Sequence, residues 1–374
     1  MPYKNLRRHV WAEISKQNFI HNLLLIKRRL KTNVELLIVI KADAYGHGAL
    51  ELAQVAIENG ISYFGVATFD EAMELRERFR EARILVLGYT LPNNAKEAVI
   101  HNIELCVYDK HVAEILNRIA KQHNMQANIH IKLDTGMNRI GYECNKKNLE
   151  EIKEILAFSN LDIKGIFTHF ATADSNDLSY TEEQYNRFQD FISLLQKKHI
   201  PLHCANSAAI INAEYSHLDI VRLGIVMYGL KPRVDMDMKG LDLKAVMSLK
   251  ANIIHIKDIE KHQSVGYGRT FIASENTRVA TLPIGYADGY MRLLSNKAEV
   301  LIQGRRAKII GNICMDQCMI DISQVDAKIG DCVTLFGYDS IGNEIKVDEL
   351  AAQINTIGYE MVCAVSKRVP RVYI

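Results

Sequence analysis

A lysine followed by a glycine-containing loop is the segment of the sequence with the clearest chemical potential. The run from Leu36 to Ile40 is wholly apolar, and Lys41 and the segment ADAYGHG follow it. A continuous aliphatic run is typical of a strand buried on both faces of a parallel sheet. A lysine at the carboxyl end of such a strand would be partly desolvated, which favours the uncharged amine that can form a Schiff base. The alternative is a lysine that merely ends the strand and points to solvent.

Other polar residues follow apolar runs further along the first two thirds of the chain. Arg139, in KLDTGMNRIG, could hold an anion, although a surface loop with an incidental salt bridge is the simpler interpretation. His169 ends the run IKGIFTHF, where a hydrogen-bonded structural histidine is the more common case. The segments HCANSAA and RLGIVMYG could bind a phosphate through Ser207 and the backbone of Gly224 and Ile225.

The last third of the chain contributes a different set of motifs. VGYGRTF cannot be a nucleotide-binding loop of the usual kind, because no βα unit surrounds it. A tyrosine between glycines can project freely, so Tyr267 is a candidate acid or base, with a plain turn as the alternative. The segments IGYADG, NICMDQCM and TIGYEM carry further exposed-looking side chains that could equally serve packing.

These residues need a scaffold, and the sequence predicts a barrel for the first of them. Strand-like and helix-like segments alternate from about residue 34 to residue 230, and eight such units fit a closed (β/α)8 barrel better than an open sheet. Such barrels place their chemistry at the carboxyl ends of the strands. The predicted strands are 36–40, 61–67, 84–89, 104–109, 127–134, 161–170, 201–207 and 218–224, and the predicted helices are 49–58, 70–79, 95–100, 112–122, 149–158 and 182–198.

From about residue 241 the pattern changes to short alternating strands, which predicts a second, mainly antiparallel β domain. We therefore expect an α/β barrel domain over residues 1–240 and a β domain over residues 241–374, with the Asp-rich segment 234–243 as linker. The predicted strands of the β domain are 249–256, 278–284, 298–302, 307–313 and 332–338, with one helix at 347–355.

Composition excludes several classes of function. The 374 residues carry a net charge of +2 with no basic block, which argues against a nucleic-acid partner. No apolar run is long enough for a membrane span, and no apolar segment follows the basic N-terminal residues as in a secretory signal. Seven dispersed cysteines without a metal-ligand spacing predict reduced thiols, a cytoplasmic protein and no metal site.

Taken together, the motifs resemble those of alanine racemase, a fold-type III enzyme that uses pyridoxal 5′-phosphate (PLP). The resemblance runs in order along nearly the whole chain, through the segments at 38–48, 132–141, 167–174, 203–209, 221–230, 265–268, 284–289, 312–319 and 356–360. It implies a homodimer with shared active sites that interconverts L- and D-alanine and supplies D-alanine for peptidoglycan.

The resemblance also implies a role for each matching residue. Lys41 would hold PLP and act as one base, and Tyr267 of the neighbouring subunit would be the second base on the opposite face of the substrate. Arg222 would donate to the pyridine nitrogen, supported by His203 and Asn206. The remaining cofactor contacts would come from Tyr45, Ser207, Gly224, Ile225 and Tyr359 at the phosphate, and from His169 beside the ring.

On the substrate side, the resemblance implies that Arg139 lies near the carboxylate and that Lys132, a lysine carbamylated in many members, orients it. Met315 and Asp316 from the partner would line the substrate side, and Tyr286 would narrow the entrance. The nearest competing interpretation is a PLP-dependent amino-acid decarboxylase of the same fold type. A non-catalytic PLP-binding protein and a barrel that only binds a ligand are less favoured, because the first lacks a β domain and the second leaves every motif idle.

Overall fold

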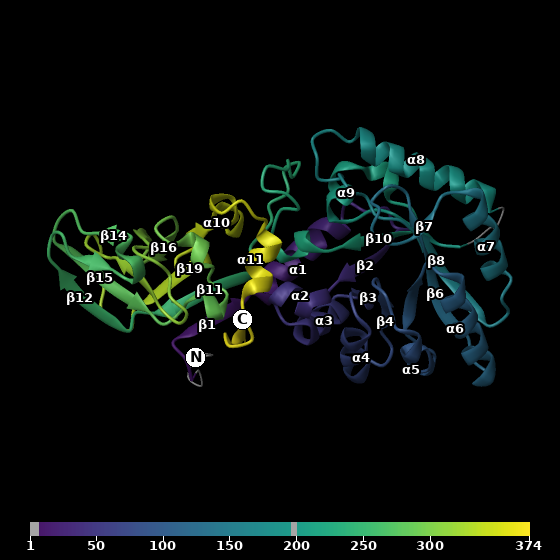
Figure 1. Cartoon of the computed structure of the whole chain (residues 1–374), viewed down its shortest axis with the longest axis horizontal. Helices are drawn as coiled ribbons and strands as arrows, with labels where there is room; N and C mark the ends of the chain where they lie inside the picture. The colour runs from purple at the N-terminus through teal and green to yellow at the C-terminus, as the bar shows by residue number, and fades with distance from the viewer. Residues whose placement is uncertain (1–6, 196–199) are drawn as a thin grey trace.

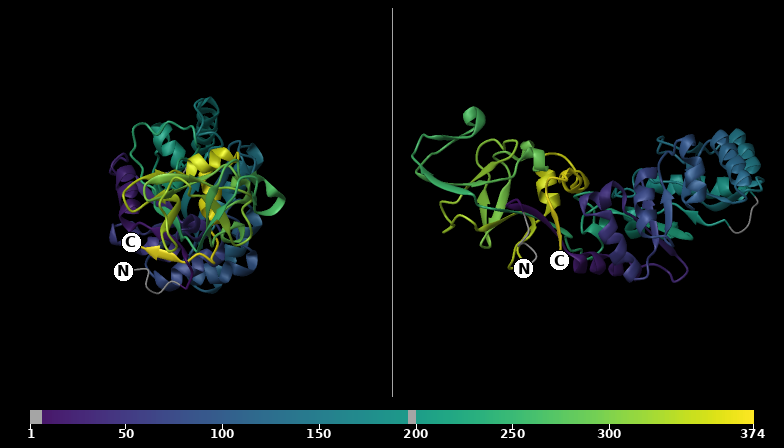
Figure 2. Two further views of the ribbon diagram at one scale, coloured as in Figure 1. Left: turned by 90° about the vertical axis from the view of Figure 1, so that its left-hand side faces the viewer. Right: turned by 90° about the horizontal axis from the view of Figure 1, so that it is seen from below.

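A computed structural model describes residues 7–195 and 200–374. It consists of two bodies, a barrel and a β domain, that lie side by side along the long axis of the molecule (Figures 1 and 2). This confirms the predicted α/β barrel followed by a mainly antiparallel domain. The end of the predicted helix 182–198 falls outside the described residues. Within them, no helix is both long and apolar enough to cross a membrane.

Parallel strands form the wall of the barrel, and each is buried because helices cover its outer face. The ladder runs from β10 to β9, and backbone bonds from Asp219 to Leu202 and from Arg222 to Ala205, each 3.0 Å, bring its two ends together. In ladder order the strands are β10 (Ile220–Leu223), β2 (Glu35–Val39), β3 (Tyr63–Val66), β4 (Arg83–Val86), β5 (Glu104–Val107), β6 (Ala127–Asp134), β8 (Leu161–Phe167) and β9 (Leu202–His203), and the short β7 (Tyr142–Glu143) pairs with β6.

The six predicted helices of the barrel are all present as α3 to α8, since each has a buried apolar face, whereas α1, α2 and α9 were not predicted. Side-chain caps fix several of their starts: Thr68 and Glu71 form a capping box on α4, and Asp109 caps α6. The helices are α1 (Lys16–Lys27), α2 (Lys41–Gly46), α3 (Ala49–Glu58), α4 (Phe69–Arg78), α5 (Ala95–Ile100), α6 (Lys110–Gln122), α7 (Lys146–Leu156), α8 (Ser179–Leu194) and α9 (Ser207–Asn212).

The β domain is built on a mixed sheet whose strands come from both ends of the described chain. β1 (Val10–Ile14) pairs antiparallel with β11 and parallel with β21, although the predicted boundary assigned residues 1–240 to the barrel. Its apolar residues are buried in this sheet. The strand order is β17 (Arg305–Lys308), β16 (Glu299–Ile302), β19 (Cys332–Tyr338), β11 (Met247–Asn252), β1 and β21 (Arg371–Tyr373), and β20 (Glu344–Ile345) pairs with β19.

Two smaller sheets form the end of the β domain farthest from the barrel (Figure 1). The single strand predicted at 249–256 is two strands, β11 and β12, because the chain leaves one sheet after Asn252 and enters another at His255. The small sheets comprise β12 (His255–Ile259), β15 (Thr277–Leu282) and β18 (Cys318–Asp321), and β13 (Ser264–Val265) with β14 (Phe271–Ile272).

Two C-terminal helices, α10 (Val347–Gln353) and α11 (Gly358–Ala364), lie between the sheet of the β domain and the barrel (Figure 1). The sequence predicted the first of them but not the second. α11 packs beside α2, which begins at Lys41. The C-terminal segment therefore reaches the edge of the barrel where the lysine lies.

Candidate active site

A cavity of about 570 Å³ opens at the carboxyl ends of the barrel strands. The predicted site residues of the barrel gather around it, although they come from five different strand ends, and α11 adds one more. They are Lys41, Tyr45, Lys132, Arg139, His169, Asn206, Ser207, Arg222, Gly224, Ile225 and Tyr359. The convergence follows from the closed barrel, which directs every strand end to one mouth.

Lys41 begins a turn with an uncommon backbone. Residues 42–45 (Ala-Asp-Ala-Tyr) all have φ between 52° and 54°, so α2 is a left-handed turn made without glycine. Left-handed backbone costs an L-residue about 1–2 kcal/mol, so neighbouring groups must hold the turn. The amide of Ala42 donates to Glu71 Oε1 at 2.7 Å, and Asp43 Oδ1 accepts from the amide of Ala49 at 2.7 Å.

His47 supports the same turn from beneath. Its Nδ1 lies 3.0 Å from the carbonyl of Ala44 and 2.9 Å from that of Tyr45, so Nδ1 must carry the proton and donate. Burial lowers the pKa of His47 to about 4. The ring is therefore neutral near pH 7, and it packs against Tyr228 with centroids 4.7 Å apart. The histidine of the GHG segment is therefore a structural residue.

The amine of Lys41 is prepared for nucleophilic chemistry. Burial, and after it the positive charge of Arg139, lowers the pKa of Lys41. Within the described residues no carboxylate forms an ion pair with the Lys41 amine, so nothing there fixes its charge in the way a salt bridge would. A desolvated, uncompensated lysine is the type of amine that bonds to an aldehyde.

Arg222, on β10, occupies the floor of the cavity and is 3% exposed. Its Nη1 donates to His203 Nδ1 (2.8 Å) and to the carbonyl of His203 (3.1 Å). Its Nη2 donates to the carbonyls of Thr168 (2.7 Å) and Cys204 (3.1 Å) and lies 3.2 Å from His169 Nδ1. The described residues thus occupy both terminal nitrogens of the guanidinium and leave Nε–H available to an acceptor in the cavity.

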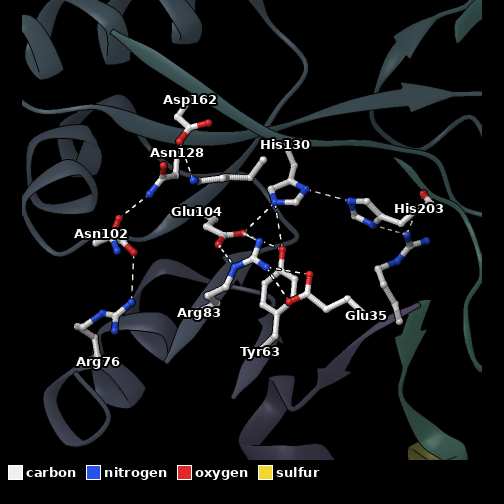
Figure 3. Close-up of polar contacts among 12 residues, drawn as sticks. Glu35, Tyr63, Arg76, Arg83, Asn102, Glu104, Asn128, His130, Asp162 and His203 are labelled. Carbon is white, nitrogen blue, oxygen red and sulfur yellow. Dashed lines mark hydrogen bonds and ion pairs between the residues drawn. The ribbon is translucent and has the colours of Figure 1, made fainter. Parts of the chain in front are cut away.

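A hydrogen-bonded chain continues from Arg222 through the barrel interior (Figure 3). Because Arg222 donates to His203 Nδ1, the His203 proton lies on Nε2 and is donated to His130 Nδ1 at 2.9 Å. The His130 proton is then on Nε2, which lies 2.8 Å from Glu104 Oε2. Burial lowers the pKa of both histidines, so each acts as a neutral relay with one fixed tautomer.

Glu104 ends this chain at the opposite side of the barrel. It also accepts from Tyr63 Oη at 2.7 Å and from Arg83 Nε at 2.8 Å, and Arg83 reaches Glu35 near the surface. Burial opposes ionisation of Glu104, but the hydrogen bonds from His130 and Arg83 outweigh it and lower its pKa to about 2. The carboxylate therefore anchors a directed chain that fixes the orientation of Arg222.

The opposite side of the cavity carries neutral donors. Ser207 Oγ accepts from the amide of Gly224 at 2.7 Å, and a Cβ on Gly224 would lie 3.1 Å from Tyr45 Oη. Burial raises the pKa of Tyr45 and Tyr359, so both phenols stay protonated near pH 7. Their rings lie 5.9 Å apart. Hydroxyls and backbone groups in such a cluster suit a phosphate.

Asn206 has a structural role that the sequence pattern did not indicate. It is the N-cap of α9, and its Oδ1 accepts from the amide of Ala209 at 3.0 Å. The cap fixes the start of α9, where Ser207 is the first residue. Asn206 therefore also positions the hydroxyl of Ser207 in the cavity.

Lys132 and Arg139 share the third side of the cavity. Burial lowers the pKa of Lys132 to about 8, and its amine donates to the carbonyl of Leu133 at 2.7 Å. The loop that carries Arg139 is closed by Asp134 Oδ1, which accepts from the amides of Gly136 and Asn138. Asp134 is thus a loop-closing residue, and its carboxylate forms no ion pair with Arg139 within the described residues.

Four predicted site residues of the β domain do not line this cavity: Tyr267, Tyr286, Met315 and Asp316. They lie together on the β domain instead: Asn312 Nδ2 donates to the carbonyl of Tyr267 at 2.7 Å, and the amide of Tyr286 donates to the carbonyl of Cys314 at 3.1 Å. Tyr267 is 75% exposed and lies between β13 and β14, and Figure 1 shows β14 at the end of the domain far from the barrel. Met315 is 53% exposed, and Asp316 pairs with Arg368 at 2.7 Å.

Comparison with known families and structures accounts for both halves. The family model for the N-terminal domain of alanine racemase matches residues 14–232, and the model for its C-terminal domain matches residues 246–373. The chain belongs to the alanine racemase family. It is therefore an amino-acid racemase, an isomerase, and membership of the alanine racemase family implies PLP as cofactor.

Individual relatives agree over their full length. An alanine racemase of Desulforamulus reducens is 43% identical over 373 residues, which cover 99% of this chain and 100% of the relative. One of Clostridium tetani is 44% identical over 377 residues, covering 100% and 97%. A solved alanine racemase of Clostridium difficile has a TM-score of 0.93 at 38% identity, covering 99% of this chain and 97% of that one.

A solved alanine racemase of Bacillus anthracis with bound L-Ala-P has a TM-score of 0.92 at 34% identity, covering 99% of this chain and 96% of that one. It shares the fold of this chain over both domains.

Sequence reasoning missed several side chains around the alanine racemase cavity. Glu71, which holds the lysine turn, could have been recognised from the Thr68–Glu71 capping pattern. Glu104 begins a strand whose other residues are apolar, and His130 lies between two isoleucines, so both could have been recognised as buried polar residues. Arg371, which contacts the lysine turn from the last strand, left no signal in the sequence.

Proposed function

We propose that this enzyme interconverts L- and D-alanine with PLP, using Lys41 and Tyr267 as two bases on opposite faces of the substrate. The observation that carries the proposal is the division of one chain into two complementary half-sites. The barrel holds a desolvated lysine in a cavity, and the β domain holds an exposed tyrosine in a cluster that does not line that cavity.

The residues of the barrel cavity fit PLP. Arg222 offers the unused Nε–H to a pyridine nitrogen, Lys41 offers an amine to the aldehyde, and neutral hydroxyls and the Gly224 backbone surround the position of a phosphate. When bound, PLP supplies the electron-withdrawing ring that makes the α-proton of alanine removable. Asn206 and His169 complete the wall beside the ring.

Arg222 determines what kind of assistance the ring nitrogen receives. Burial lowers the pKa of Arg222 to about 10, so the guanidinium remains protonated near pH 7. It can donate a hydrogen bond to the nitrogen but cannot transfer a proton as a carboxylic acid would. The chain that ends at Glu104 keeps Arg222 in this orientation, and we infer that weaker electron withdrawal favours proton exchange over side reactions.

Two bases are needed because racemisation removes a proton from one face of Cα and delivers one to the other. Lys41 removes the α-proton of D-alanine, and the phenol of Tyr267 delivers a proton to the opposite face to give L-alanine. In the reverse direction Tyr267 removes the α-proton of L-alanine, and Lys41 delivers a proton to give D-alanine. Tyr267 does not line the cavity that contains Lys41, and β14, which follows it, lies at the end of the β domain far from the barrel (Figure 1). We therefore propose that the tyrosine at each cavity comes from a second copy of the chain in a homodimer.

The remaining predicted residues define the substrate. Arg139 would receive the carboxylate of alanine, and a carbamylated Lys132 would orient Arg139. A pKa of about 8 leaves part of the Lys132 amine uncharged near neutral pH, which is the form that reacts with CO₂. Tyr286 with Met315 and Asp316 of the second copy would restrict the pocket to a methyl side chain.

We further propose that the enzyme is cytoplasmic and supplies D-alanine for peptidoglycan. The balanced surface charge and the dispersed cysteines support an intracellular location. A PLP-dependent decarboxylase of the same fold type is not favoured, because both family matches and the named relatives are alanine racemases.

The direct test is incubation of the PLP-loaded protein with L-alanine in D₂O, followed by chiral chromatography and mass spectrometry. D-alanine that carries deuterium at Cα is the expected product. Release of CO₂ without D-alanine would instead identify a decarboxylase, and recovery of unlabelled L-alanine alone would contradict catalysis at Cα.

Mixing two inactive variants tests the shared site. Lys41→Ala and Tyr267→Phe are each expected to lose net racemisation, because each lacks one of the two bases, but a hybrid dimer of the two has one site with both native bases. After unfolding and refolding together, about a quarter of the native sites should reappear if subunits pair at random. No recovery in the mixture would contradict a site shared between two copies.

A further inference from the structure

Arg371, on β21 of the β domain, ties the end of the chain to the turn that carries Lys41. Its Nε donates to the carbonyl of Gly46 at 2.9 Å. Its Nη1 donates to the carbonyls of Ser366 (2.6 Å) and Val369 (2.7 Å), and its Nη2 donates to the carbonyl of Val365 (2.6 Å). The half-buried guanidinium donates hydrogen bonds to four backbone carbonyls, so its position is fixed and it links the C-terminal segment to the turn.

The two glycines of the lysine turn are the points where the C-terminal segment makes contact. A Cβ on Gly46 would lie 2.6 Å from the carbonyl oxygen of Val362, on α11. A Cβ on Gly48 would lie 1.8 Å from the hydroxyl of Tyr373, on β21 beside Arg371. Both glycines also have positive φ, of 80° and 99°. The glycines therefore allow the β domain to press directly on the backbone of the turn.

The turn requires such contacts, because residues 42–45 are left-handed without the help of glycine. On the barrel side the carboxylate of Glu71 holds its first amide, and His47 holds the carbonyls of Ala44 and Tyr45. On the other side, Arg371 holds the carbonyl of Gly46, at the end of the left-handed stretch. The turn is thus held at both ends, once by each domain.

We propose that Arg371 is a positioning residue for Lys41, so that docking of the β domain on the barrel sets the place of the amine in the cavity. This inference rests on the proposed role of Lys41 in racemisation. Arg371 itself lies on the far side of the turn and takes no part in proton transfer. Its effect is transmitted through Gly46 and the left-handed residues to Lys41.

The hydrogen bonds of Arg371 also connect the Lys41 turn to the part of the cavity where a phosphate would lie. Val365, whose carbonyl accepts from Arg371, caps the C-terminus of α11, and α11 carries Tyr359. One guanidinium therefore holds both the turn with Lys41 and the helix with Tyr359. A change at Arg371 should displace the two ends of the cavity relative to each other.

The test compares Arg371→Gln and Arg371→Lys with the native PLP-loaded dimer. Neither variant can donate to four carbonyls at once. We expect the amides of Ala42, Ala44 and Gly48 to exchange with deuterium on the order of tenfold faster than in the native enzyme. We expect kcat to fall on the order of tenfold because the amine is misplaced, while KM for alanine stays within about twofold.

Arg306→Gln is the matched control, since Arg306 is an arginine of the same domain that pairs with Glu349 and Glu299 on the surface. It should leave the exchange of residues 42–48 and kcat unchanged. If Arg371→Gln does not fold, Arg371→Lys, which keeps the charge, gives the same reading.

Unchanged exchange of residues 42–48 in a folded Arg371 variant would overturn the inference, and so would faster exchange with native kcat. Hydrogen exchange of the turn does not depend on the reaction, so it remains informative whatever the enzyme does. Racemisation by Lys41→Ala would instead overturn the proposed function and would not affect the exchange result.

Discussion

The mouth of the barrel and the far end of the β domain are two halves of one proposed site, but they are built in opposite ways. In the barrel, Arg222 is 3% exposed and belongs to a chain of buried hydrogen bonds that ends at Glu104. In the β domain, Tyr267 is 75% exposed, and it lies between two glycines with φ of 72°. The barrel half is fixed by buried hydrogen bonds within one chain, whereas the β-domain half is exposed.

The difference teaches where each kind of function can be placed. A group that must hold one orientation, such as the donor to a ring nitrogen, gains from burial and from neighbours that fix its tautomer and direction. A group that must meet a substrate held by a second subunit has to remain exposed until that subunit arrives. The exposure of Tyr267 therefore agrees with the proposed site shared between two copies.

The largest effect is expected from removing the Lys41 amine from the barrel cavity. Lys41→Ala should lower kcat/KM in both directions by at least about 10⁴-fold, because it removes both a base and the attachment of PLP. Chiral chromatography of alanine measures the loss, and circular dichroism checks the fold. Equal activity of the variant and the native enzyme would show that the cavity is not the reaction site.

Removal of the phenol from the exposed half should have a smaller and directional effect. Tyr267→Phe should slow proton removal from L-alanine by about 10²–10⁴-fold. The visible absorbance of bound PLP should be retained, because Tyr267 does not line the cofactor cavity of its own chain. A variant that loses PLP, or that slows exchange of the α-proton of D-alanine alone, would contradict the assignment.

The hydrogen-bonded chain that holds Arg222 can be weakened at a residue that does not line the cavity. Glu104→Gln keeps the shape of the side chain but leaves Arg83 and the end of the histidine chain without their carboxylate. The free energy of unfolding at pH 7 should fall by about 3 kcal/mol. Urea unfolding measures it, and Glu35→Gln is the control, since Glu35 is an exposed partner of the same Arg83.

The same variant should change the acid limb of the stability curve. The pKa of Glu104 is about 2 in the folded protein against an ordinary value of 4.5. A carboxyl with a lowered folded pKa stabilises the fold above about pH 4.5, and this contribution, at most about 3 kcal/mol, is lost as the pH falls toward 2. Glu104→Gln should therefore flatten the loss over this range. If the variant and the native protein lose stability equally at low pH, the pKa of Glu104 does not differ between the folded and unfolded states.

The smallest effect is expected at the surface of the β domain. Arg306→Gln breaks pairs with Glu349 and Glu299, whose side chains are 35% and 32% exposed. Such surface pairs contribute about 0–1 kcal/mol, so urea unfolding should detect little change. A loss as large as that of Glu104→Gln would mean that the two regions do not differ as described.

Much of the scaffold could be predicted from periodicity. The helix Ala49–Glu58 and the strand Ala127–Asp134 have the bounds that the sequence predicts, because each shows a clear buried face between strong end signals. The strand predicted at 201–207 is shorter, since Asn206 caps a helix there instead. The sequence pattern could not assign β1 to the β domain, because the two strands that pair with it begin at residues 247 and 371.

Part of the site lay beyond the reach of sequence reasoning for a similar reason. Nothing in the residue types of Ala42, Asp43 and Ala44 predicts left-handed backbone, which is imposed by contacts from other elements. The path from Arg222 through His203 could be suspected from the resemblance, but the continuation to His130 and Glu104 depends on which side chains point inward. Such long-range contacts decide orientation, and a linear pattern does not record them.

The placement of β1 between β11 and β21 has a consequence for biosynthesis. A ribosome delivers β1 long before either neighbour exists, so the strand must wait while the barrel folds behind it. The sheet can be completed only when Arg371–Tyr373 emerges, and that same arrival brings Arg371 to Gly46. Pairing of the last strand and fixing of the lysine turn are thus a single late event. An incompletely synthesised chain therefore does not have the lysine turn in its final position.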